Sequence, residues 1–292
     1  MKIMILGADG MIGHKISMTL QNTSHKLILN SRNSCKVLKK IIPKASFFNY
    51  DFLKHDILNL LEKVKPELVI NCVGLTIRRG ADKLNDAIKL NQELPHLIDR
   101  YCSSNVCKQV HFSTDCVFSG SKGNYSELDL PDATDNYGIT KTGGEVLSQN
   151  TLTIRSSMIG REIFNKTELL EWILRKQNQT IDGFSRVIYS GVTTIYMASL
   201  VTKIISRNQF LTGLYNISSP PVSKFELLNK LNDKFELGLV IKENNLTKLN
   251  KSLNSNLFFT KLKYKKPDWD DMIEELFIDS KKFSELYKNI QK

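Results

Sequence analysis

The chain has 292 residues, of which 41% are hydrophobic, so it can form a nucleotide-binding domain with a smaller second lobe, and wholesale disorder is excluded. Its net charge of +11 is spread along the chain, which favours an anionic small-molecule substrate and argues against nucleic acid as a partner. No apolar run is long enough for a membrane span, and the short apolar start is unlike a signal peptide, so we expect a cytoplasmic protein.

Short apolar runs alternate with amphipathic stretches in the first half of the chain. The runs predict strands at 2–6, 26–30, 45–48, 67–71, 109–113 and 152–156. Apolar residues at helical spacing predict helices over 11–21, 37–42, 53–64, 81–103 and 136–149. Such alternation is typical of βαβ units, so the predicted fold class is α/β, a Rossmann-like doubly wound parallel sheet.

The alternation weakens after Gly160. Helices are predicted over 169–175, 196–205, 224–235 and 269–276, with a strand at 213–217. We expect residues 1–160 to form an NAD(P)-binding domain to which the segment 187–217 returns. Residues 161–292 would mainly build a smaller C-terminal substrate-binding lobe.

A glycine turn follows the first predicted strand. Gly7 permits a tight turn, Gly10 lets the backbone approach a pyrophosphate, and Gly13 lets the helix pack on the strand. The N–H groups of Met11 and Ile12 would then hold the phosphates at the helix start. The spacing is G-x-x-G-x-x-G, which alone also fits a purely structural strand–helix turn.

The end of the second predicted strand indicates which cofactor binds. An acid there would bind the ribose diol of NAD, but Ser31 and Arg32 occupy these positions and could donate to a 2′-phosphate. We therefore expect NADP(H), with NAD(H) as a possible substitute, whereas the alternative for Arg32 is a solvated loop position. Asp9 would disfavour phosphates nearby, and we expect it to cap the following helix instead.

Four polar residues form the candidate catalytic group. Ser113 and Thr114 end the fifth strand, and Tyr137 and Lys141 share one face of the next helix. The ammonium of Lys141 would lower the pKa of Tyr137, whose phenol could then protonate the alkoxide formed when a hydride reaches a ketone. Thr114, with Ser113 beside it, would orient the carbonyl oxygen. Tyr-x-x-x-Lys alone is common on solvated helices, and its weight comes from this order of motifs.

The segments 113–118, 125–127 and 136–145 resemble the extended short-chain dehydrogenase/reductases. Within these they are most similar to the sugar-nucleotide reductases of the dTDP-4-dehydrorhamnose reductase group. The resemblance implies NAD(P)H-dependent reduction of a 4-keto-6-deoxy sugar nucleotide, linked to dTDP, UDP or GDP, in nucleotide-sugar and cell-surface polysaccharide biosynthesis. It is also compatible with a homodimer.

The same resemblance assigns further residues. Asp51 and Phe52 would flank the adenine, Asn91 would support the cofactor region, and Tyr137 and Lys141 would also contact the cofactor. The nicotinamide ribose would be bordered by Cys72, Val73 and Gly74. Five residues are expected to contact the substrate: Thr76, Val117, Phe118, Arg161 and Arg186. The two arginines are candidates from their position alone and would meet the pyrophosphate, with ordinary surface residues as the alternative.

Departures from the family pattern leave the sugar and some alternatives open. Cys116 stands where an aromatic residue is usual, and the segment 161–164 differs from the form expected for rhamnose synthesis. An epimerase or dehydratase of the same fold is one alternative, although dehydratases usually have an acid pair where Asp115 and Cys116 lie. Another is a non-catalytic regulatory subunit resembling that of methionine adenosyltransferase. The five cysteines are odd in number and lack C-x-x-C spacing, so neither disulfides nor a metal site is expected.

Overall fold

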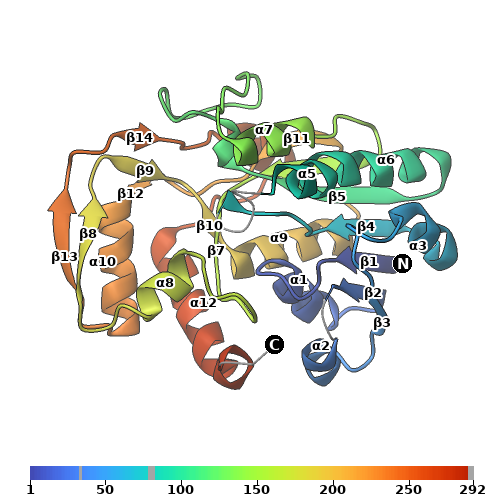
Figure 1. The fold of residues 1–292 in the computed structure, drawn as a ribbon, viewed down its shortest axis with the longest axis horizontal. Helices are drawn as coiled ribbons and strands as arrows, with labels where there is room; N and C mark the ends of the chain where they lie inside the picture. Colours follow the sequence, from blue (N-terminus) through green and yellow to red (C-terminus); the bar gives the residue numbers. More distant parts are fainter. Residues whose placement is uncertain (33–34, 78–82, 289–292) are drawn as a thin grey trace.

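A seven-stranded parallel sheet lies at the centre of the computed structural model, which describes residues 1–32, 35–77 and 83–288 (Figure 1). The strand order β11-β6-β5-β4-β1-β2-β3 confirms the predicted fold class. The strands are β1 (Lys2–Leu6), β2 (Lys26–Ser31), β3 (Ser46–Asn49), β4 (Leu68–Asn71), β5 (Lys108–Ser113), β6 (Thr151–Arg155) and β11 (Gly213–Asn216).

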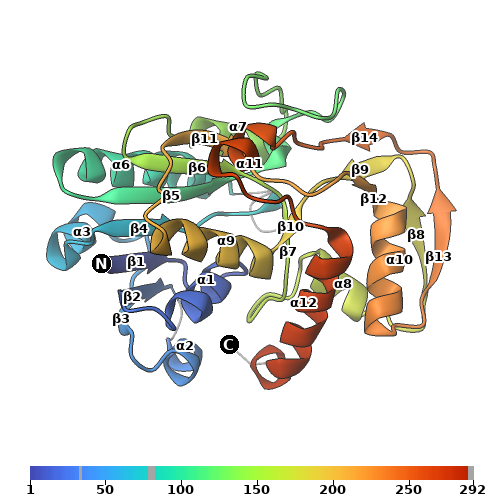
Figure 2. The same ribbon diagram turned by 180° about the vertical axis from the view of Figure 1, so that it is seen from behind.

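Successive side chains of a strand point to opposite faces of the sheet, so each face carries its own core. In β1, Ile3 and Ile5 belong to one core, and Met4 and Leu6 belong to the other. The first core is covered by α1 (Gly13–Leu20), α2 (Lys36–Ile41) and α9 (Thr194–Ser206). The opposite face is covered by α3 (Ile57–Val64), by a long helix made of α5 (Leu84–Ala87), a π-helical segment (Ile88–Glu93) and α6 (Leu94–Ser104), and by α7 (Asn136–Gly143) (Figures 1 and 2).

Two helices are shorter than their apolar spacing predicted. The helix expected from residue 53 begins at Ile57, because the Asp56 side chain accepts a hydrogen bond from Leu58 N at 2.9 Å and caps it. The helix expected over 136–149 ends at Gly143. A Cβ at Gly144 would lie 1.9 Å from the Asn91 carbonyl oxygen, so the chain turns there against the neighbouring helix.

The sheet reverses its winding between β1 and β4. From β1 the chain proceeds outward through β2 and β3, whereas β4, β5 and β6 extend the sheet on the other side. Open α/β sheets bind ligands at the carboxyl ends of the strands beside such a switch point. Gly7 follows β1 with φ +66°, and a Cβ there would lie 3.2 Å from the Cys72 carbonyl after β4. The two strand ends therefore meet at this crevice.

A second lobe packs beside the sheet (Figure 1). It contains the parallel pair β8 (Thr180–Phe184) and β13 (Val240–Asn244), together with β9 (Val187–Tyr189) between β12 (Val222–Ser223) and β14 (Leu249–Asn250). Its helices are α8 (Leu169–Leu174), α10 (Lys224–Phe235) and α12 (Trp269–Lys282), while α9, β11 and α11 (Asn256–Leu262) return to the main sheet. β7 (Met158–Ile159) and β10 (Val192–Thr193) pair at the junction. Among the described residues, no helix combines the length and apolar character needed to cross a membrane.

The buried His14 makes the stability of this fold sensitive to acid. Burial and the neighbouring charges of Lys15 and Arg161 lower the pKa of His14 from 6.5 to about 3. Between these values the unfolded chain binds a proton that the folded chain excludes, so stability falls as the pH drops through this range. By pH 4 the loss from His14 should reach about 3 kcal/mol.

Urea unfolding at pH 7, 5 and 4 measures this loss. His14→Gln should lose less stability than the wild type between pH 7 and pH 4, because its side chain does not titrate. Equal losses in the two proteins would contradict the assignment.

Candidate active site

A cavity of about 640 Å³ opens at the carboxyl ends of the strands and is lined by both lobes. It brings together residues that lie far apart in the sequence. The predicted site residues that line it are Gly7, Gly10, Met11, Ile12, Arg32, Asp51, Phe52, Cys72, Val73, Gly74, Thr76, Ser113, Thr114, Tyr137 and Lys141.

The glycine turn forms one wall of the cavity. Gly10 N donates to the Gly7 carbonyl at 2.9 Å. A Cβ at Gly13 would lie 2.2 Å from the Gly7 oxygen, so glycine lets α1 pack directly on the turn, and Gly13 itself does not line the cavity. A Cβ at Gly10 would meet only the Gly7 oxygen, at 3.2 Å. The backbone can therefore come close to a ligand at the start of α1, where a pyrophosphate fits.

The side chains of Ser31 and Asp9 form a hydrogen bond with one another beside this turn. The fully buried Ser31 hydroxyl donates to the Asp9 carboxylate at 2.7 Å and does not line the cavity. The cap residue of α1 is Ile12, without a side-chain cap bond, so the prediction that Asp9 caps this helix is wrong. Arg32 is exposed and lines the cavity. Of the two expected phosphate ligands, the geometry thus favours Arg32 alone.

Asn30 and Tyr50 also line the cavity and were not singled out by sequence reasoning. The Asn30 carboxamide accepts from Gly7 N at 3.4 Å and donates to the Tyr50 carbonyl at 3.1 Å. It thereby ties the glycine turn to the segment that carries Asp51 and Phe52 after β3. The only sequence signal for these residues was their place at the ends of predicted strands.

Asn91 supports the site from behind. This fully buried side chain accepts from Leu75 N at 2.8 Å and donates to the Leu75 carbonyl at 3.0 Å. It also donates to the Thr140 hydroxyl on α7 at 3.2 Å. Asn91 does not line the cavity, but it fixes the strand-end segment 72–76 relative to the helix that carries Tyr137 and Lys141.

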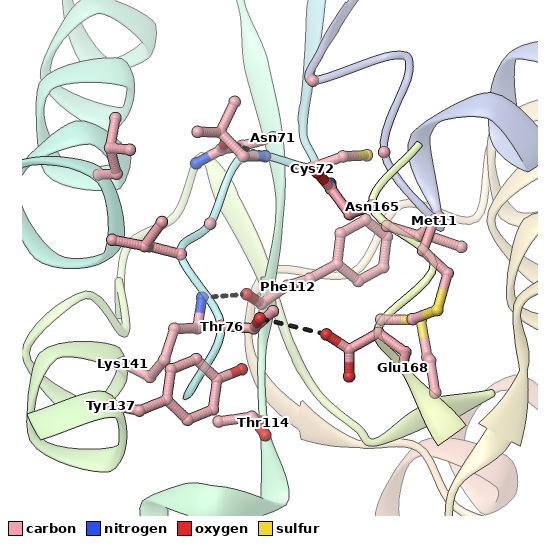
Figure 3. A pocket seen from close by; sticks show the side chains of 18 of the residues that line it. Met11, Asn71, Cys72, Thr76, Phe112, Thr114, Tyr137, Lys141, Asn165 and Glu168 are labelled. Atoms are coloured by element: carbon pink, nitrogen blue, oxygen red, sulfur yellow. Dashed lines mark hydrogen bonds between the residues drawn. The ribbon is translucent and has the colours of Figure 1, made fainter. Parts of the chain in front are cut away.

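Two local features bring Tyr137 to Thr114. The Asp135 side chain caps α7 by accepting from Gly138 N at 2.9 Å. A Cβ at Gly138 would lie 2.4 Å from the Cys116 carbonyl, so glycine lets α7 settle on the turn that follows Thr114. In Figure 3 the phenol of Tyr137 and the side chain of Thr114 lie together on one side of the cavity.

The pKa of Tyr137 is raised, so the prediction of a lowered pKa is wrong. Burial is the largest cause and Cys116 adds to it, whereas a hydrogen bond with Thr114 opposes the rise. The Lys141 ammonium donates to the Phe112 carbonyl at 2.6 Å (Figure 3). Burial lowers the pKa of Lys141 to about 8, against the opposing charge of Glu145. Desolvation therefore decides the direction of the Tyr137 pKa shift, and the spacing of Tyr137 and Lys141 alone could not reveal this.

Ser113 reaches the cavity, but its hydroxyl is engaged elsewhere. It donates to the Glu145 carboxylate at 2.7 Å, and the same carboxylate is paired with Arg155. Ser113 thus anchors the end of β5. The Thr114 hydroxyl also has partners, since it donates to the Asp115 carboxylate at 3.2 Å and accepts from Cys116 N at 3.1 Å.

Four of the five predicted substrate contacts lie outside the cavity. Val117 and Phe118 are fully buried, because Phe118 stacks on Tyr125 with ring centroids 4.0 Å apart. Arg161 pairs with Glu171 at 2.7 Å, and Arg186 is an exposed residue between β8 and β9. The structure therefore does not bring these four residues to the cavity wall, and their substrate contacts stay predictions.

Thr76 is the one predicted substrate contact that lines the cavity. It lies beside cavity residues that the sequence analysis did not identify. Its hydroxyl donates to the Glu168 carboxylate at 3.2 Å across the cavity (Figure 3). Phe164 and Asn165 line the same wall. The Glu162 carboxylate holds this loop by accepting from Thr167 N at 2.6 Å and Glu168 N at 2.8 Å. No periodic pattern marked this irregular segment.

No set of three His, Cys, Asp or Glu side chains within the described ranges could hold a metal ion. The cysteines there are free thiols, and burial raises the pKa of Cys116 to about 12. Thr114, Tyr137, Lys141 and Glu168 are among the polar side chains that line the cavity.

Comparison with known proteins places these features in a family. The model of the family described as "RmlD substrate binding domain" matches residues 1–277 of this chain. A dTDP-4-dehydrorhamnose reductase of Burkholderia thailandensis is 27% identical over 165 residues, which are 54% of this chain and 50% of the relative. Methionine adenosyltransferase 2 subunit beta of Xenopus tropicalis is 22% identical over 256 residues, 81% of this chain and 72% of that protein.

The chain spans about half the length of the curated reductases that it matches, 46% and 50%. The fold also resembles that of a solved structure. The dTDP-4-dehydrorhamnose reductase of Bacillus anthracis, in complex with NADP, superposes with a TM-score of 0.79 and 19% identity, over 96% of this chain and 99% of the other.

Proposed function

Because the chain belongs to the family of the RmlD substrate binding domain, we propose that it reduces the keto group of a sugar nucleotide with NADPH. One observation carries the proposal: a single cavity unites the glycine turn with Thr114, Tyr137 and Lys141. The substrate is a 4-keto-6-deoxy sugar linked to dTDP, UDP or GDP, and its product serves cell-surface polysaccharide synthesis. The similar reductase of Burkholderia thailandensis supports this substrate class.

The residues present fit a nicotinamide dinucleotide. The turn from Gly7 to Ile12 would hold the pyrophosphate, Asp51 and Phe52 would flank the adenine, and the segment 72–74 would border the nicotinamide ribose. When bound, the cofactor supplies the hydride that reduces the ketone. NAD(H) can replace NADP(H) if the 2′-phosphate contact contributes little.

The chain's own residues supply the proton and the orientation. The raised pKa of Tyr137 keeps its phenol protonated at neutral pH, which is the form that can donate to the developing alkoxide. Thr114, hydrogen-bonded to Tyr137, orients the substrate oxygen toward the phenol. The Lys141 ammonium, buried under the same wall, stabilises the phenolate that remains.

Arg32 should determine the cofactor preference. Arg32→Ala should lower kcat/KM for NADPH about 10- to 100-fold, because a hydrogen bond to a charged phosphate is lost, and it should leave kcat/KM for NADH nearly unchanged. Lys39→Ala is the control, since Lys39 is a nearby cation that does not line the cavity. An equal loss with both cofactors would show that Arg32 does not contact the 2′-phosphate.

A panel of dTDP-, UDP- and GDP-linked 4-keto-6-deoxy sugars tests the function, with NADPH absorbance as the readout. We expect stoichiometric NADPH consumption with at least one member. An isomerised or dehydrated product without NADPH consumption would indicate the epimerase or dehydratase alternative instead.

The similarity to methionine adenosyltransferase 2 subunit beta supports a second candidate, a non-catalytic regulatory subunit. No turnover on the whole panel, together with co-purification of a partner enzyme, would favour this candidate over the reductase. Light scattering on the purified protein measures whether it is a homodimer.

A further inference from the structure

The end of the described chain returns to the cofactor turn. After α12, a short 3-10 turn (Ser284–Tyr287) brings Tyr287 against His14 of α1. Tyr287 is buried, and its hydroxyl lies 3.0 Å from His14 Nε2, with the two rings edge to face at 5.9 Å.

The hydrogen bonds of His14 fix the direction of this contact. His14 Nδ1 lies 2.8 Å from the Gly10 carbonyl oxygen, which can only accept, so Nδ1 carries a proton. The fully buried ring is neutral, so Nε2 can accept from the Tyr287 hydroxyl, which is also hydrogen-bonded with the Asp279 carboxylate. The Gly10 carbonyl therefore sets the tautomer, and the Tyr287 hydroxyl holds the ring through Nε2. His14 in turn contacts Gly10, which lines the cavity.

The same tyrosine contacts the opposite wall of the site. The Arg161 guanidinium lies 4.4 Å from the centroid of the Tyr287 ring, and Lys166 Nζ donates to the Tyr287 carbonyl at 2.6 Å. Arg161 and Lys166 belong to the segment 161–168, which carries Phe164, Asn165 and Glu168 into the cavity. One residue near the C-terminus is thus in contact with both the turn and this segment.

We propose that Tyr287 is a positioning residue for both walls of the site. Its hydroxyl, acting through His14, holds the turn that receives the cofactor pyrophosphate, and its ring and carbonyl hold the 161–168 segment that receives the sugar nucleotide. The inference rests on the proposed function. It assigns different roles to the hydroxyl and to the ring of Tyr287, and substitutions can remove the hydroxyl alone or both groups together.

Equilibrium binding of NADPH and steady-state kinetics test these two parts. Tyr287→Phe removes only the hydroxyl, so the Kd for NADPH should rise about two- to tenfold while the KM for the sugar nucleotide stays unchanged. Tyr287→Ala also removes the ring, so both values should rise. Tyr264→Phe is the matched control, because the Tyr264 hydroxyl bonds to Gln209 and neither residue lines the cavity, so it should change neither value.

A double-mutant cycle and amide exchange distinguish this role from general loss of stability. Once His14→Phe has removed the acceptor, Tyr287→Phe should raise the Kd for NADPH no further, whereas additive effects would overturn the connection through His14. Amide hydrogen exchange in residues 8–16 should accelerate in Tyr287→Phe without cofactor present, and unchanged exchange would likewise overturn it.

The outcomes also separate this inference from the proposed function. A wild-type protein that binds no NADP(H) would overturn both. A wild type that binds NADPH, with Tyr287→Phe binding it equally well, would overturn the role of Tyr287 and leave the reductase function standing. If Tyr287→Ala does not fold, the comparison of Tyr287→Phe with Tyr264→Phe decides.

Discussion

Tyr137→Phe should lower kcat about 10²- to 10⁴-fold, because it removes the group that donates a proton to the developing alkoxide. The ring remains in place, so the cavity wall and the seating of α7 on the Cys116 carbonyl are preserved. We expect the Kd for NADPH to change only a few-fold, since the glycine turn, the proposed site of the pyrophosphate, is untouched. Stopped assays of NADPH oxidation with the preferred keto-sugar nucleotide measure kcat, and fluorescence titration measures the Kd.

Tyr125→Phe is the control for this experiment. Tyr125 is also buried and its hydroxyl is hydrogen-bonded, by Lys122 N at 3.0 Å, but it does not line the cavity. This variant should keep nearly the full rate. A Tyr137→Phe protein as active as the wild type would rule out Tyr137 as the proton donor and return attention to other hydroxyls of the cavity, Thr114 first.

Arg155→Met should destabilise the fold by about 3–5 kcal/mol, because it leaves a buried carboxylate without its charge partner. Arg155 is 3% exposed, and its guanidinium donates to both oxygens of Glu145, at 2.7 Å from Nε and 2.6 Å from the terminal nitrogen. The Ser113 hydroxyl also donates to Glu145. The pair therefore joins the ends of β5 and β6 beneath the helix that carries Tyr137.

Urea unfolding, followed by the fluorescence of Trp172 and Trp269, measures this effect. The double variant Arg155→Met, Glu145→Leu should recover much of the lost stability, since no unpaired buried charge remains. Lys234→Ala breaks the exposed pair with Glu274 and should cost less than about 1 kcal/mol. A loss below about 1 kcal/mol in Arg155→Met would show that the Glu145 carboxylate finds another partner or takes up a proton.

Features set by neighbouring residues could be predicted from the sequence. The apolar run from Lys2 to Leu6 predicted a strand, and the glycines after it indicated a turn into a helix. Tyr137 and Lys141 stand one helical turn apart, so they had to share a face. These inferences used spacings within one element, and backbone geometry alone fixes such spacings.

The substrate wall and the electrostatics could not be predicted in this way. Arg161 looked like a phosphate ligand, but it pairs with Glu171, and Glu168 faces the cavity through a contact with Thr76, 92 residues away. The sign of the pKa shift of Tyr137 depends on how much water the folded lobes exclude from its phenol. Sequence by itself determined the strands of the sheet, the glycine turn and the helix that carries Tyr137 and Lys141, because local periodicity specifies them. Only the tertiary structure decided which side chains meet across the cavity and how far they are desolvated, because both depend on contacts between distant segments.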